Sequence, residues 1–364
     1  MSRIPILSSL ALVLAAAACG DESPSAPATS TGARRDAVPH TEVRDLADLG
    51  TFGWNHGFGF EINNRGEIAG RTDLGPPNAP TQAHAVFWSP RDGVTDLGTL
   101  GGTNSETRAL NDHGLVVGLA QKAGDALFQR HPTVWRVSQS GFETIELGPF
   151  VNGQAEDVNN AGVVVGWSTP FVFGPPTGFR WTEDGGIETI PPIAGLRSQP
   201  GGINEAGDVV GSSTVSPPFV DHAVIWWRDG TVTDIGTMGG NAMARSINAR
   251  GEVAGFGQVC PGCAFHAFYW SAEDGLIDLG TFGGTRSFAF EIDNHGRVAG
   301  FYETADLVRH AFIWTKEGGK VDLPTLGGAE SSTGSINARG QVTGRAADAS
   351  GTVHAVIWQL GNEP

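Results

Sequence analysis

Six histidines recur in one short motif, in which His is followed by Ala or Pro and, four positions later, by Trp. They are His84, His131, His222, His266, His310 and His354. Imidazole can bind a metal or transfer a proton, but a metal needs its ligands about 2 Å from one point. Copies in successive repeats lie apart, so we predict neither a metal site nor catalytic residues here. We expect each imidazole to bond a nearby backbone or acidic group, with a recurring Asp-Leu-Gly segment as a partner.

Cys260 and Cys263 flank a Pro-Gly turn and are two of the three cysteines in the chain. In an exported protein such a pair favours a local disulfide, which we predict. A redox centre would sit at a helix start that lowers the thiol pKa, and no helix pattern is present here. Zinc, with His266 as a third ligand, would need further ligands.

Three carboxylates occupy equivalent positions two residues before a recurring Asn or Asp: Glu61, Asp157 and Glu291. If they face the axis of a ring of repeats, they line its channel and could hold a cation. If they face the neighbouring repeat, they are paired or lie at a rim, and we favour this interpretation. No Ser/His/Asp spacing, nucleophile elbow or cofactor-binding motif accompanies them, so we expect no cofactor.

Aromatic side chains gather in segments that break the repeat. The candidate ligand-binding residues among them, with one histidine, are Trp54, His56, Phe171, Phe173, Phe219 and Phe265. Aromatic groups exposed on loops suit sugar rings or apolar peptide anchors. The alternative is that Pro-rich loops merely fold these rings onto the strands.

The elements that would position all these residues are repeats, four of which place their His 44 residues apart. Each repeat contains an Asn-x-x-Gly or Asp-x-x-Gly string, starting at Asn63, Asn111, Asn159, Asn204, Asn248, Asp293 and Asn337. Asn first and Gly fourth is typical of a type I turn in a tight hairpin. An apolar run ending in Gly, the His-to-Trp run and the Asp-Leu-Gly run follow. Each repeat therefore predicts four short antiparallel strands.

Four strands in about 44 residues is the size of a propeller blade. Seven such units predict an all-β, seven-bladed β-propeller of four-stranded antiparallel blades over residues 42–364. A β-solenoid has shorter coils and needs capping ends. The last unit stops at Trp358 without a fourth strand, whereas residues 42–50 carry an Asp-Leu-Gly strand with no unit of their own. We therefore expect the N-terminal strand to complete the last blade.

The His-Ala-Phe strings at His266 and His310, with the Asn-x-x-Gly and Asp-Leu-Gly-Thr-Leu-Gly-Gly elements, resemble the HAF-repeat family of predicted extracellular bacterial proteins. The resemblance covers residues 42–364. It implies export and repetition, but no established substrate or catalytic residue. Two units depart from the pattern, with Pro132 after the His and Gly178 in place of it.

The first residues predict export. Residues 1–18 read as a signal peptide with an apolar core. The small residues before Cys19 resemble the lipobox of bacterial lipoproteins, so we expect an acylated Cys19 and a lipid anchor in the cell envelope, at the periplasm, outer membrane or cell surface. Ala16 stands where the box usually has Leu, which leaves simple cleavage near Ala18 open. Residues 19–41, rich in Ser, Pro and Ala, predict a disordered tether.

The composition of the chain restricts the kinds of partner that we expect. A net charge of −16 without a cluster of Lys and Arg argues against nucleic acid. No later apolar run approaches the roughly 18 residues of a transmembrane helix, so we expect membrane contact only through the anchor.

We therefore expect a recognition or scaffold module that binds a polysaccharide or an envelope protein, and not an enzyme. The variable segments join the second and third strands and share a face with the connections between units, and this loop face is the expected binding surface. One alternative is a glycan hydrolase or lyase with its site near the axis, which perturbed carboxylates or His in one deep pocket would favour. The other is a structural spacer without a ligand.

Overall fold

The computed structural model describes residues 42–45, 57–74, 82–126, 129–215 and 219–361. The chain divides into two compact units, Met1–Ala37 and Val38–Pro364. The predicted signal peptide, Cys19 and the tether lie outside the described residues, as do Trp54 and His56. The fold described below is that of the second unit.

Four consecutive strands of one repeat form one antiparallel sheet. The sheet of β14 (Ser198–Ile203), β15 (Val209–Val215), β16 (Val220–Trp226) and β17 (Val232–Gly236) shows the pattern, with the strands adjacent in chain order. The Gly that ends each apolar run allows a close approach of two strands. A Cβ on Gly211 would lie 2.2 Å from the carbonyl oxygen of Gln199, so only glycine fits there.

Three further sheets repeat this order. They consist of β10 (Asn152–Val158), β11 (Val164–Thr169), β12 (Thr177–Thr182) and β13 (Gly186–Ile190); of β18 (Ala242–Ile247), β19 (Val253–Gln258), β20 (Phe265–Ser271) and β21 (Gly275–Gly280); and of β22 (Arg286–Ile292), β23 (Val298–Glu303), β24 (Arg309–Thr315) and β25 (Gly319–Asp322).

One larger sheet has eight strands. It contains β2 (Gly57–Ile62), β3 (Ile68–Asp73), β4 (Ala83–Ser89), β5 (Gly93–Asp96), β6 (Gly101–Leu110), β7 (Leu115–Lys122), β8 (His131–Ser138) and β9 (Gly141–Glu146). A single parallel pair, Ala83 with Asn104, joins β4 to β6. On either side of this bridge the strands pair antiparallel, as in the four-stranded sheets.

The sixth sheet joins the two ends of the unit. It contains β26 (Gly327–Ile336), β27 (Gln341–Asp348), β28 (Val353–Gln359) and β1 (Glu42–Asp45), in the order β1-β28-β27-β26. Strand β1 pairs antiparallel with β28, and Val43 lies opposite Trp358. This is the pairing that the unmatched ends of the sequence predict.

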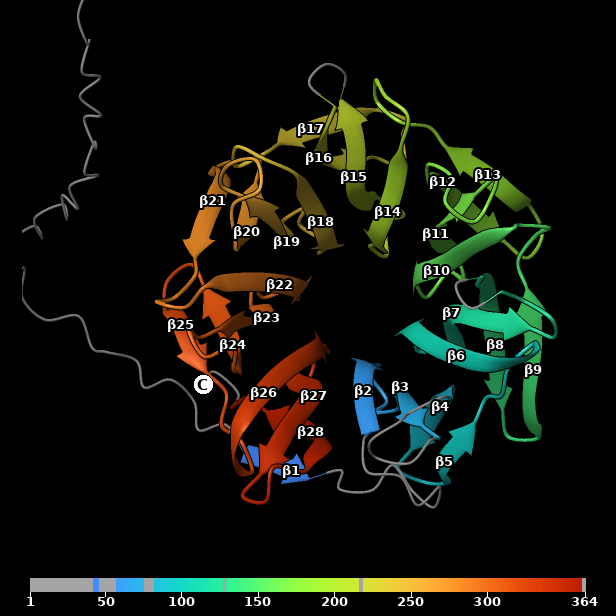
Figure 1. Ribbon diagram of the computed structural model, residues 1–364, viewed down its shortest axis with the longest axis horizontal. Coiled ribbons are helices and arrows are strands. Elements are labelled where there is room, and N and C mark those ends of the chain that lie inside the picture. The colour runs from blue at the N-terminus through green and yellow to red at the C-terminus, as the bar shows by residue number, and fades with distance from the viewer. Residues whose placement is uncertain (1–41, 46–56, 75–81, 127–128, 216–218, 362–364) are drawn as a thin grey trace, which may run out of the picture. The chain divides into compact units, whose positions relative to one another are not determined.

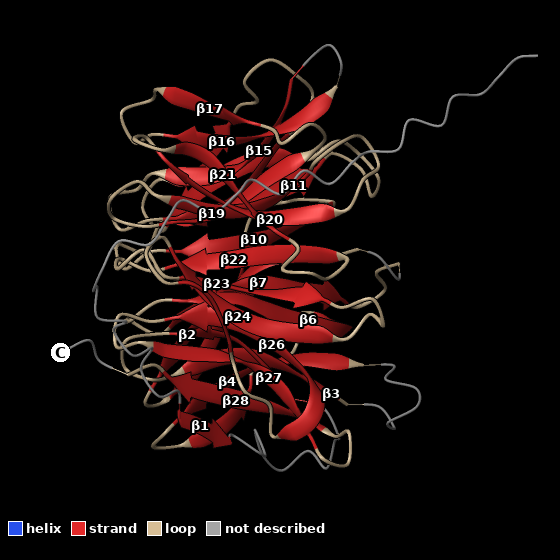
Figure 2. Ribbon diagram, turned by 90° about the vertical axis from the view of Figure 1, so that its left-hand side faces the viewer, coloured by secondary structure: helices blue, strands red, loops and turns tan. Residues whose placement is uncertain are grey.

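The sheets surround a central axis. Figure 1 shows β2, β6, β10, β14, β18, β22 and β26 nearest to that axis. In the perpendicular view of Figure 2, loops and turns lie on two opposite faces, with the strands between them. The prediction of an all-β fold with repeated four-stranded antiparallel sheets is confirmed. Within the described residues, no helix has the length and hydropathy needed to cross a membrane.

The recurring Asn holds both its own turn and the next one. At Asn63, the side-chain Oδ1 accepts hydrogen bonds from the backbone N–H groups of Arg65 and Glu67, both at 2.9 Å, and the backbone carbonyl accepts one from Gly66 at 3.0 Å. The side-chain Nδ2 donates to the backbone carbonyl of Asn111 at 3.1 Å. One residue therefore closes a hairpin and ties it to its neighbour.

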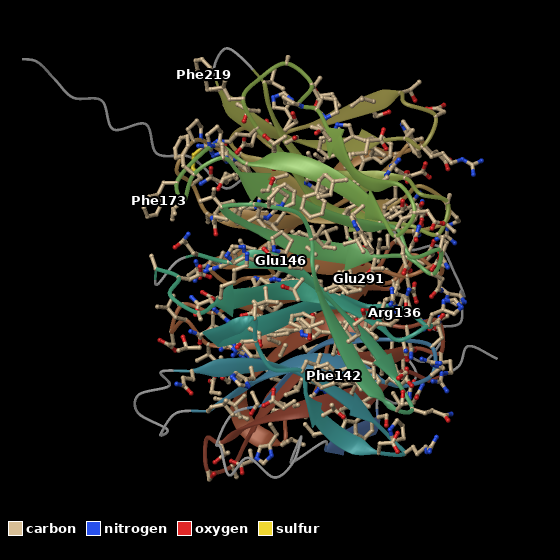
Figure 3. The ribbon with its side chains drawn as sticks, turned by 90° about the vertical axis from the view of Figure 1, so that its right-hand side faces the viewer. Arg136, Phe142, Glu146, Phe173, Phe219 and Glu291 are labelled. Carbon is tan, nitrogen blue, oxygen red and sulfur yellow. A yellow bond between two sulfur atoms is a disulfide. The ribbon has the colours of Figure 1, made fainter. Side chains whose placement is uncertain are left out.

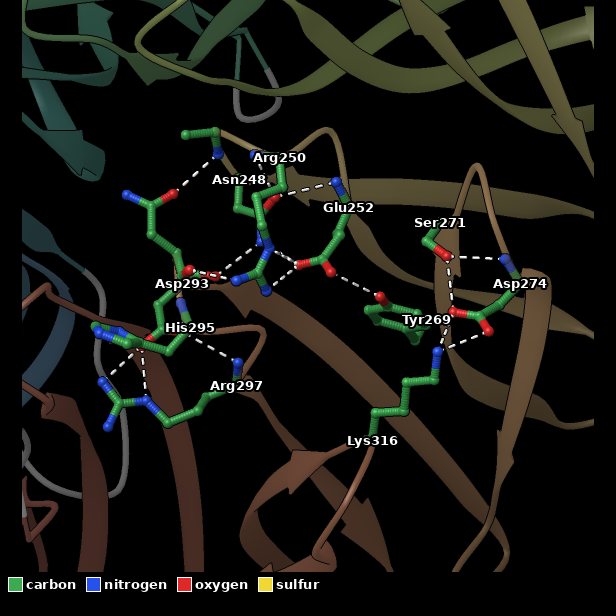
Figure 4. A network of polar contacts seen from close by, with 12 residues as sticks. Asn248, Arg250, Glu252, Tyr269, Ser271, Asp274, Asp293, His295, Arg297 and Lys316 are labelled. Carbon is green, nitrogen blue, oxygen red and sulfur yellow. Dashed lines mark hydrogen bonds and ion pairs between the residues drawn. The ribbon is translucent and has the colours of Figure 1, made fainter. Parts of the chain in front are cut away.

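These bonds form a ring that we call the Asn belt. The same Nδ2-to-carbonyl bond links Asn111 to Asn159, Asn159 to Asn204, Asn204 to Asn248, Asn248 to Asp293, and Asn337 back to Asn63. Asp293 has no amide to donate, and its carboxylate pairs with Arg297 at 2.6 Å instead, as Figure 4 shows. The belt ties the last sheet to the first.

The core lies between neighbouring sheets. Ile225 of β16, for example, belongs to the same buried cluster as Ala244 of β18 and Phe268 of β20. The Trp that ends the His-to-Trp run contributes to these layers, and Trp135 and Trp358 are completely buried. Because each sheet buries both faces against its neighbours, the repeated apolar runs are required throughout the ring.

Candidate functional site

A recess of about 420 Å³ opens at the axis of the ring, and we call it the mouth recess. Five arginines and four phenylalanines line it: Arg71, Arg108, Arg245, Arg309, Arg345, Phe58, Phe60, Phe290 and Phe301. Most belong to the axis-facing β2, β6, β18 and β22 or to the second strands β3, β23 and β27. Phe58 is near the start of β2 and Arg71 near the end of β3. The recess therefore opens on the loop face, opposite the Asn turns.

Carboxylates lie within ion-pair distance of four of the five arginines of the recess. Arg71 and Arg108 share Glu106, each at 3.0 Å, and Arg71 also pairs with Asp73 at 3.1 Å. Arg245 lies 3.7 Å from Glu156. The Nε atoms of Arg71, Arg108 and Arg245 are buried and have no hydrogen-bond acceptor among the described residues. The guanidinium groups therefore retain unused donors.

Arg345, in β27, has no carboxylate within ion-pair distance in the described part of the chain. Its guanidinium carbon lies 5.3 Å from the ring centre of Phe58, and that of Arg71 lies 5.2 Å from the same ring. Burial lowers the pKa of Arg345, and the positive charges of Arg309 and Arg71 lower it further, against Glu330, which raises it. Two cations thus contact one aromatic ring at the recess.

Phenylalanine rings extend from the loop face into the recess. Phe265 contacts Phe256 and Phe288, with ring centres 5.6 and 5.7 Å apart, and Phe290 lies 5.6 Å from Phe301. Phe288 joins the two groups through Phe301, at 5.2 Å. Phe265 is half-buried in this cluster, so the alternative that loops fold the aromatic rings onto the strands holds for this residue.

The other described aromatic candidates are exposed. Phe171, Phe173 and Phe219 are 58%, 84% and 64% exposed. Figure 3 shows Phe173 and Phe219 on the same side of the ring, away from Arg136. Phe219 has a backbone φ of 62°, a conformation that a bulky residue adopts only at a cost in energy. The structure places these rings on the rim of the loop face, outside the lining of the recess.

The three equivalent carboxylates lie deeper in the channel. Glu61 and Glu291 line the mouth recess and also a second opening of about 200 Å³ at the Asn turns, so they lie at the waist between the two. Asp157 Oδ2 accepts a hydrogen bond from the backbone N–H of Ile203, in the neighbouring sheet, at 2.7 Å. Glu61 and Glu291 therefore line the channel, and both Asp157 and Glu291 bond a neighbouring sheet, because the hydroxyl of Ser246 donates to Glu291.

Burial raises the pKa of all three carboxyls. That of Asp157 rises to about 6 although two backbone N–H groups donate to it. That of Glu291 rises to about 8, with the charge of Asp157 adding to burial and the hydroxyl of Ser246 opposing it. The pKa of Glu61 lies well above its usual value because of burial and the charge of Glu291. Among the described residues, no group of His, Cys, Asp and Glu could hold a metal ion.

The recurring histidines bond mainly within their own sheets. The Nδ1 atoms of His84, His222 and His266 lie 2.9 to 3.0 Å from the Asp of the following Asp-Leu-Gly or Asp-Ile-Gly segment. His310 instead stacks on Tyr302, with ring centres 5.4 Å apart. Cys260 and Cys263 form a disulfide, with their Cα atoms 5.1 Å apart.

Comparison with known proteins identifies the architecture. No family model matches this chain, and no curated protein matches it. Among solved structures, the β-propeller domain of the Trilobed protease from Pyrococcus furiosus is similar, with a TM-score of 0.55, 10% identity, and coverage of 86% of this chain and 96% of that one. The second unit of this chain, Val38–Pro364, is a β-propeller.

Two further structures have the same kind of similarity. The acylaminoacyl peptidase of Pyrococcus horikoshii has a TM-score of 0.53 and 11% identity, over 87% of this chain and 54% of its own. A puromycin hydrolase has a TM-score of 0.53 and 13% identity, over 86% of this chain and 55% of its own. This chain therefore spans about half the length of those two proteins. At such identities the similarity shows the fold of the propeller alone.

Sequence reasoning missed the arginines of the recess, although a signal for them exists. Arg108 and Arg245 stand three residues before the recurring Asn, where other repeats have Phe, Glu or Gly. Arg71 and Arg345 follow the Gly that ends the apolar run, where others have Leu, Trp, Ser or Phe. Variable positions inside recurring strands, and not only variable loops, mark the channel surface of a propeller.

Proposed function

We propose that this chain is a cell-envelope lipoprotein of the HAF-repeat kind, whose seven-bladed propeller recognises a polysaccharide or an envelope protein through its loop face. On this proposal, residues 1–18 are removed, Cys19 carries the lipid and residues 19–41 form the tether. The domain from residue 42 is the binding module, and the mouth recess is the centre of its binding surface.

The seven-blade count takes the eight-stranded sheet as two blades. Its two halves share only the parallel pair of Ala83 and Asn104, whereas the strands within each half pair along most of their length. Seven turns of the Asn belt, one for each proposed blade, support the same count. The pairing of β1 with β28 supports a last blade that combines both ends of the domain.

The mouth recess is the observation that carries the binding function. It combines a volume of about 420 Å³ with converging charged and aromatic side chains, and variable loops rim it. Exposed Phe173 and Phe219 extend the surface from the recess to the rim. A spacer without a ligand has no use for such a recess, so recognition accounts for more of the surface.

A binding screen with the chain from Gly20 tests this function. Glycans and solubilised envelope fractions would be screened against the wild type, Trp54→Ala, Phe173→Ala and Phe142→Ala. Phe142 is a matched control, because it is an exposed phenylalanine on the outer strand β9. We expect Phe173→Ala to weaken binding about tenfold and Phe142→Ala to leave it unchanged. The absence of any retained ligand would contradict the proposal.

The lipid anchor has a separate test. Cells that express the full chain would be labelled with a radioactive fatty acid, and Cys19→Ala would be compared with the wild type. The proposal predicts labelled protein in the membrane fraction for the wild type and unlabelled protein for the variant. Equal labelling of both would contradict acylation at Cys19.

A second candidate function is a glycan hydrolase or lyase with its site at the waist. It is favoured by Glu291 at the waist, whose pKa of about 8 keeps its carboxyl protonated near neutral pH, and by Asp157, whose charge acts on Glu291 and whose pKa rises to about 6. This candidate predicts that a bound polysaccharide is shortened during incubation and that Glu291→Gln stops the cleavage without loss of binding. Recognition alone predicts an unchanged polymer length.

A further inference from the structure

We propose that the mouth recess binds an acidic glycan, with a carboxylate or sulfate of the sugar at Arg345 and the sugar ring against the phenylalanines of the recess. This inference rests on the proposed binding function and specifies its ligand class. Its support comes from the charge of the residues that line the recess, from the lack of a carboxylate within ion-pair distance of Arg345 and from the aromatic walls.

The charge of the recess is opposite to that of the chain. The chain carries 39 Asp and Glu against 23 Lys and Arg, yet five arginines and three glutamates line the recess. Three further carboxylates that pair with these arginines, Asp73, Glu156 and Glu303, lie outside the lining. Glu291, at the waist, has a pKa raised to about 8 and so carries little negative charge near neutral pH, and the pKa of Glu61 beside it is also raised. A positive recess in an acidic surface concentrates anions at the axis.

Among the described residues, Arg345 is the arginine of the recess that has no carboxylate within ion-pair distance. Arg71, Arg108, Arg245 and Arg309 each lie within ion-pair distance of a carboxylate, at 3.0, 3.0, 3.7 and 3.1 Å. The guanidinium of Arg345 lies over the ring of Phe58; Glu330 acts on it only from beyond ion-pair distance, and Arg309 and Arg71 repel it. A half-buried guanidinium without a carboxylate is costly, and a bidentate anion is the group that relieves this cost.

The walls suit the apolar face of a sugar ring. Phe58 and Phe60 lie nearly parallel, with ring centres 6.2 Å apart and an angle of 5° between their planes. Phe290 and Phe301 form a second pair from β22 and β23. Arg309 lies 4.8 Å from the ring centre of Phe301, so each aromatic wall has a guanidinium beside it. Alternating rings and cations match a polymer of acidic sugars better than a neutral glycan.

The first experiment compares charged and neutral forms of the same polymer. Isothermal titration at 50 mM salt would measure binding of the chain from Gly20 to polygalacturonate, to its methyl ester, to dextran sulfate and to dextran. We expect at least tenfold tighter binding of one or both acidic polymers than of the neutral counterpart, because the guanidinium contacts depend on charge. Polygalacturonate binding alone would assign a carboxylated sugar, and dextran sulfate binding alone a sulfated one.

A matched pair of variants locates the contact. Arg345→Gln should weaken binding of the acidic polymer about tenfold or more, and Arg345→Lys should restore part of it. Arg136→Gln is the control, because it removes the same charge from β8, outside the recess. Arg136 pairs there with Glu143 at 2.6 Å, and we expect its replacement to leave polymer binding unchanged. If Arg345→Gln fails to fold, as thermal unfolding would reveal, Arg71→Gln replaces it.

The outcomes separate this inference from the proposed function. Equal binding of the acidic and the neutral form in both polymer pairs, or equal effects of the two Arg-to-Gln variants, would overturn the acidic glycan as the ligand. Polyglutamate, titrated in the same way, would overturn it as well if it bound more tightly than either acidic polymer. Retention of an envelope ligand would still support recognition in those cases. If neither a polymer nor an envelope fraction binds, both proposals are wrong.

Discussion

At the scale of single residues, position within the repeat decides whether a side chain supports the fold or is available for function. The six Asn residues of the turns each donate to the next turn, whereas Asp293 cannot, and the structural role of the Asn could be read from its recurrence in the sequence. Glu61, Asp157 and Glu291 were recognised as equivalent, but their mutual effect depends on three strands meeting across a channel. Sequence spacing cannot supply that distance, which only the closed ring defines.

Glu291 makes stability depend on pH. In the folded protein it keeps its proton up to about pH 8, whereas an ordinary glutamate releases it near 4.5. Between these values the unfolded chain binds fewer protons, so stability falls as the pH rises. We expect Glu291→Gln to raise the free energy of unfolding by roughly 2 kcal/mol at pH 8, and to change it little at pH 4.5.

Denaturant unfolding at both pH values measures this effect. Glu143→Gln is the control, because its carboxylate is on the surface of β9, with 61% of the side chain exposed. We expect this control to have the same small effect at both pH values. Equal stability changes for Glu291→Gln at pH 4.5 and pH 8 would show that the waist does not hold a protonated carboxyl.

Asn111 tests the Asn belt. Its Oδ1 accepts hydrogen bonds from His113 and Leu115, and its Nδ2 donates to the carbonyl of Asn159. Asn111→Ala loses all three and should lower the free energy of unfolding by about 3 kcal/mol. Asn111→Asp keeps the acceptor, as Asp293 does naturally, and should cost less. Thermal unfolding of both variants measures the two losses in stability. A larger loss for Asn111→Asp than for Asn111→Ala would contradict the role of Oδ1 as the acceptor.

At the scale of elements, the turns and strands were predictable because the same pattern recurs and each copy supports the others. The strand order within a sheet followed from short connections. The position of β1 followed from a strand without a repeat at the N-terminal end and a repeat without its fourth strand at the C-terminal end. The surface of the channel was not predictable in the same way. Arg71 and Arg345 come from β3 and β27, far apart in sequence, and only ring closure brings them to one phenylalanine.

Removal of β1 tests ring closure by the N-terminal strand. A chain that starts at residue 46 leaves β28 with an unpaired edge, whereas a chain that starts at residue 38 retains the pairing. We expect the shorter chain to have a Tm lower by about 5 °C and to form more aggregate at high concentration. Thermal unfolding and light scattering of the two chains provide the comparison. Equal Tm values would mean that β1 contributes nothing to closure.

At the scale of the whole molecule, the propeller supplies a rigid ring and leaves two kinds of variable position. Variable loops were evident in the sequence, and Phe173 and Phe219 are exposed on them. Variable positions in the axis-facing strands were overlooked in the sequence, because residues in regularly recurring strands were interpreted as structural. Together they form one surface, with an aromatic rim and an arginine-lined centre, on the loop face of an otherwise acidic protein.

The most direct measurement of the central claim is hydrogen exchange of the backbone with and without the retained envelope polysaccharide. Binding at the mouth recess predicts slower exchange in residues 58–61, 286–291, 332–334 and 344–345, together with the loop of Phe173. Strands β5, β9 and β13, at the outer edge, should exchange as before. Protection confined to those outer strands, or to the Asn turns on the opposite face, would contradict the claim that the loop face and its recess are the binding site.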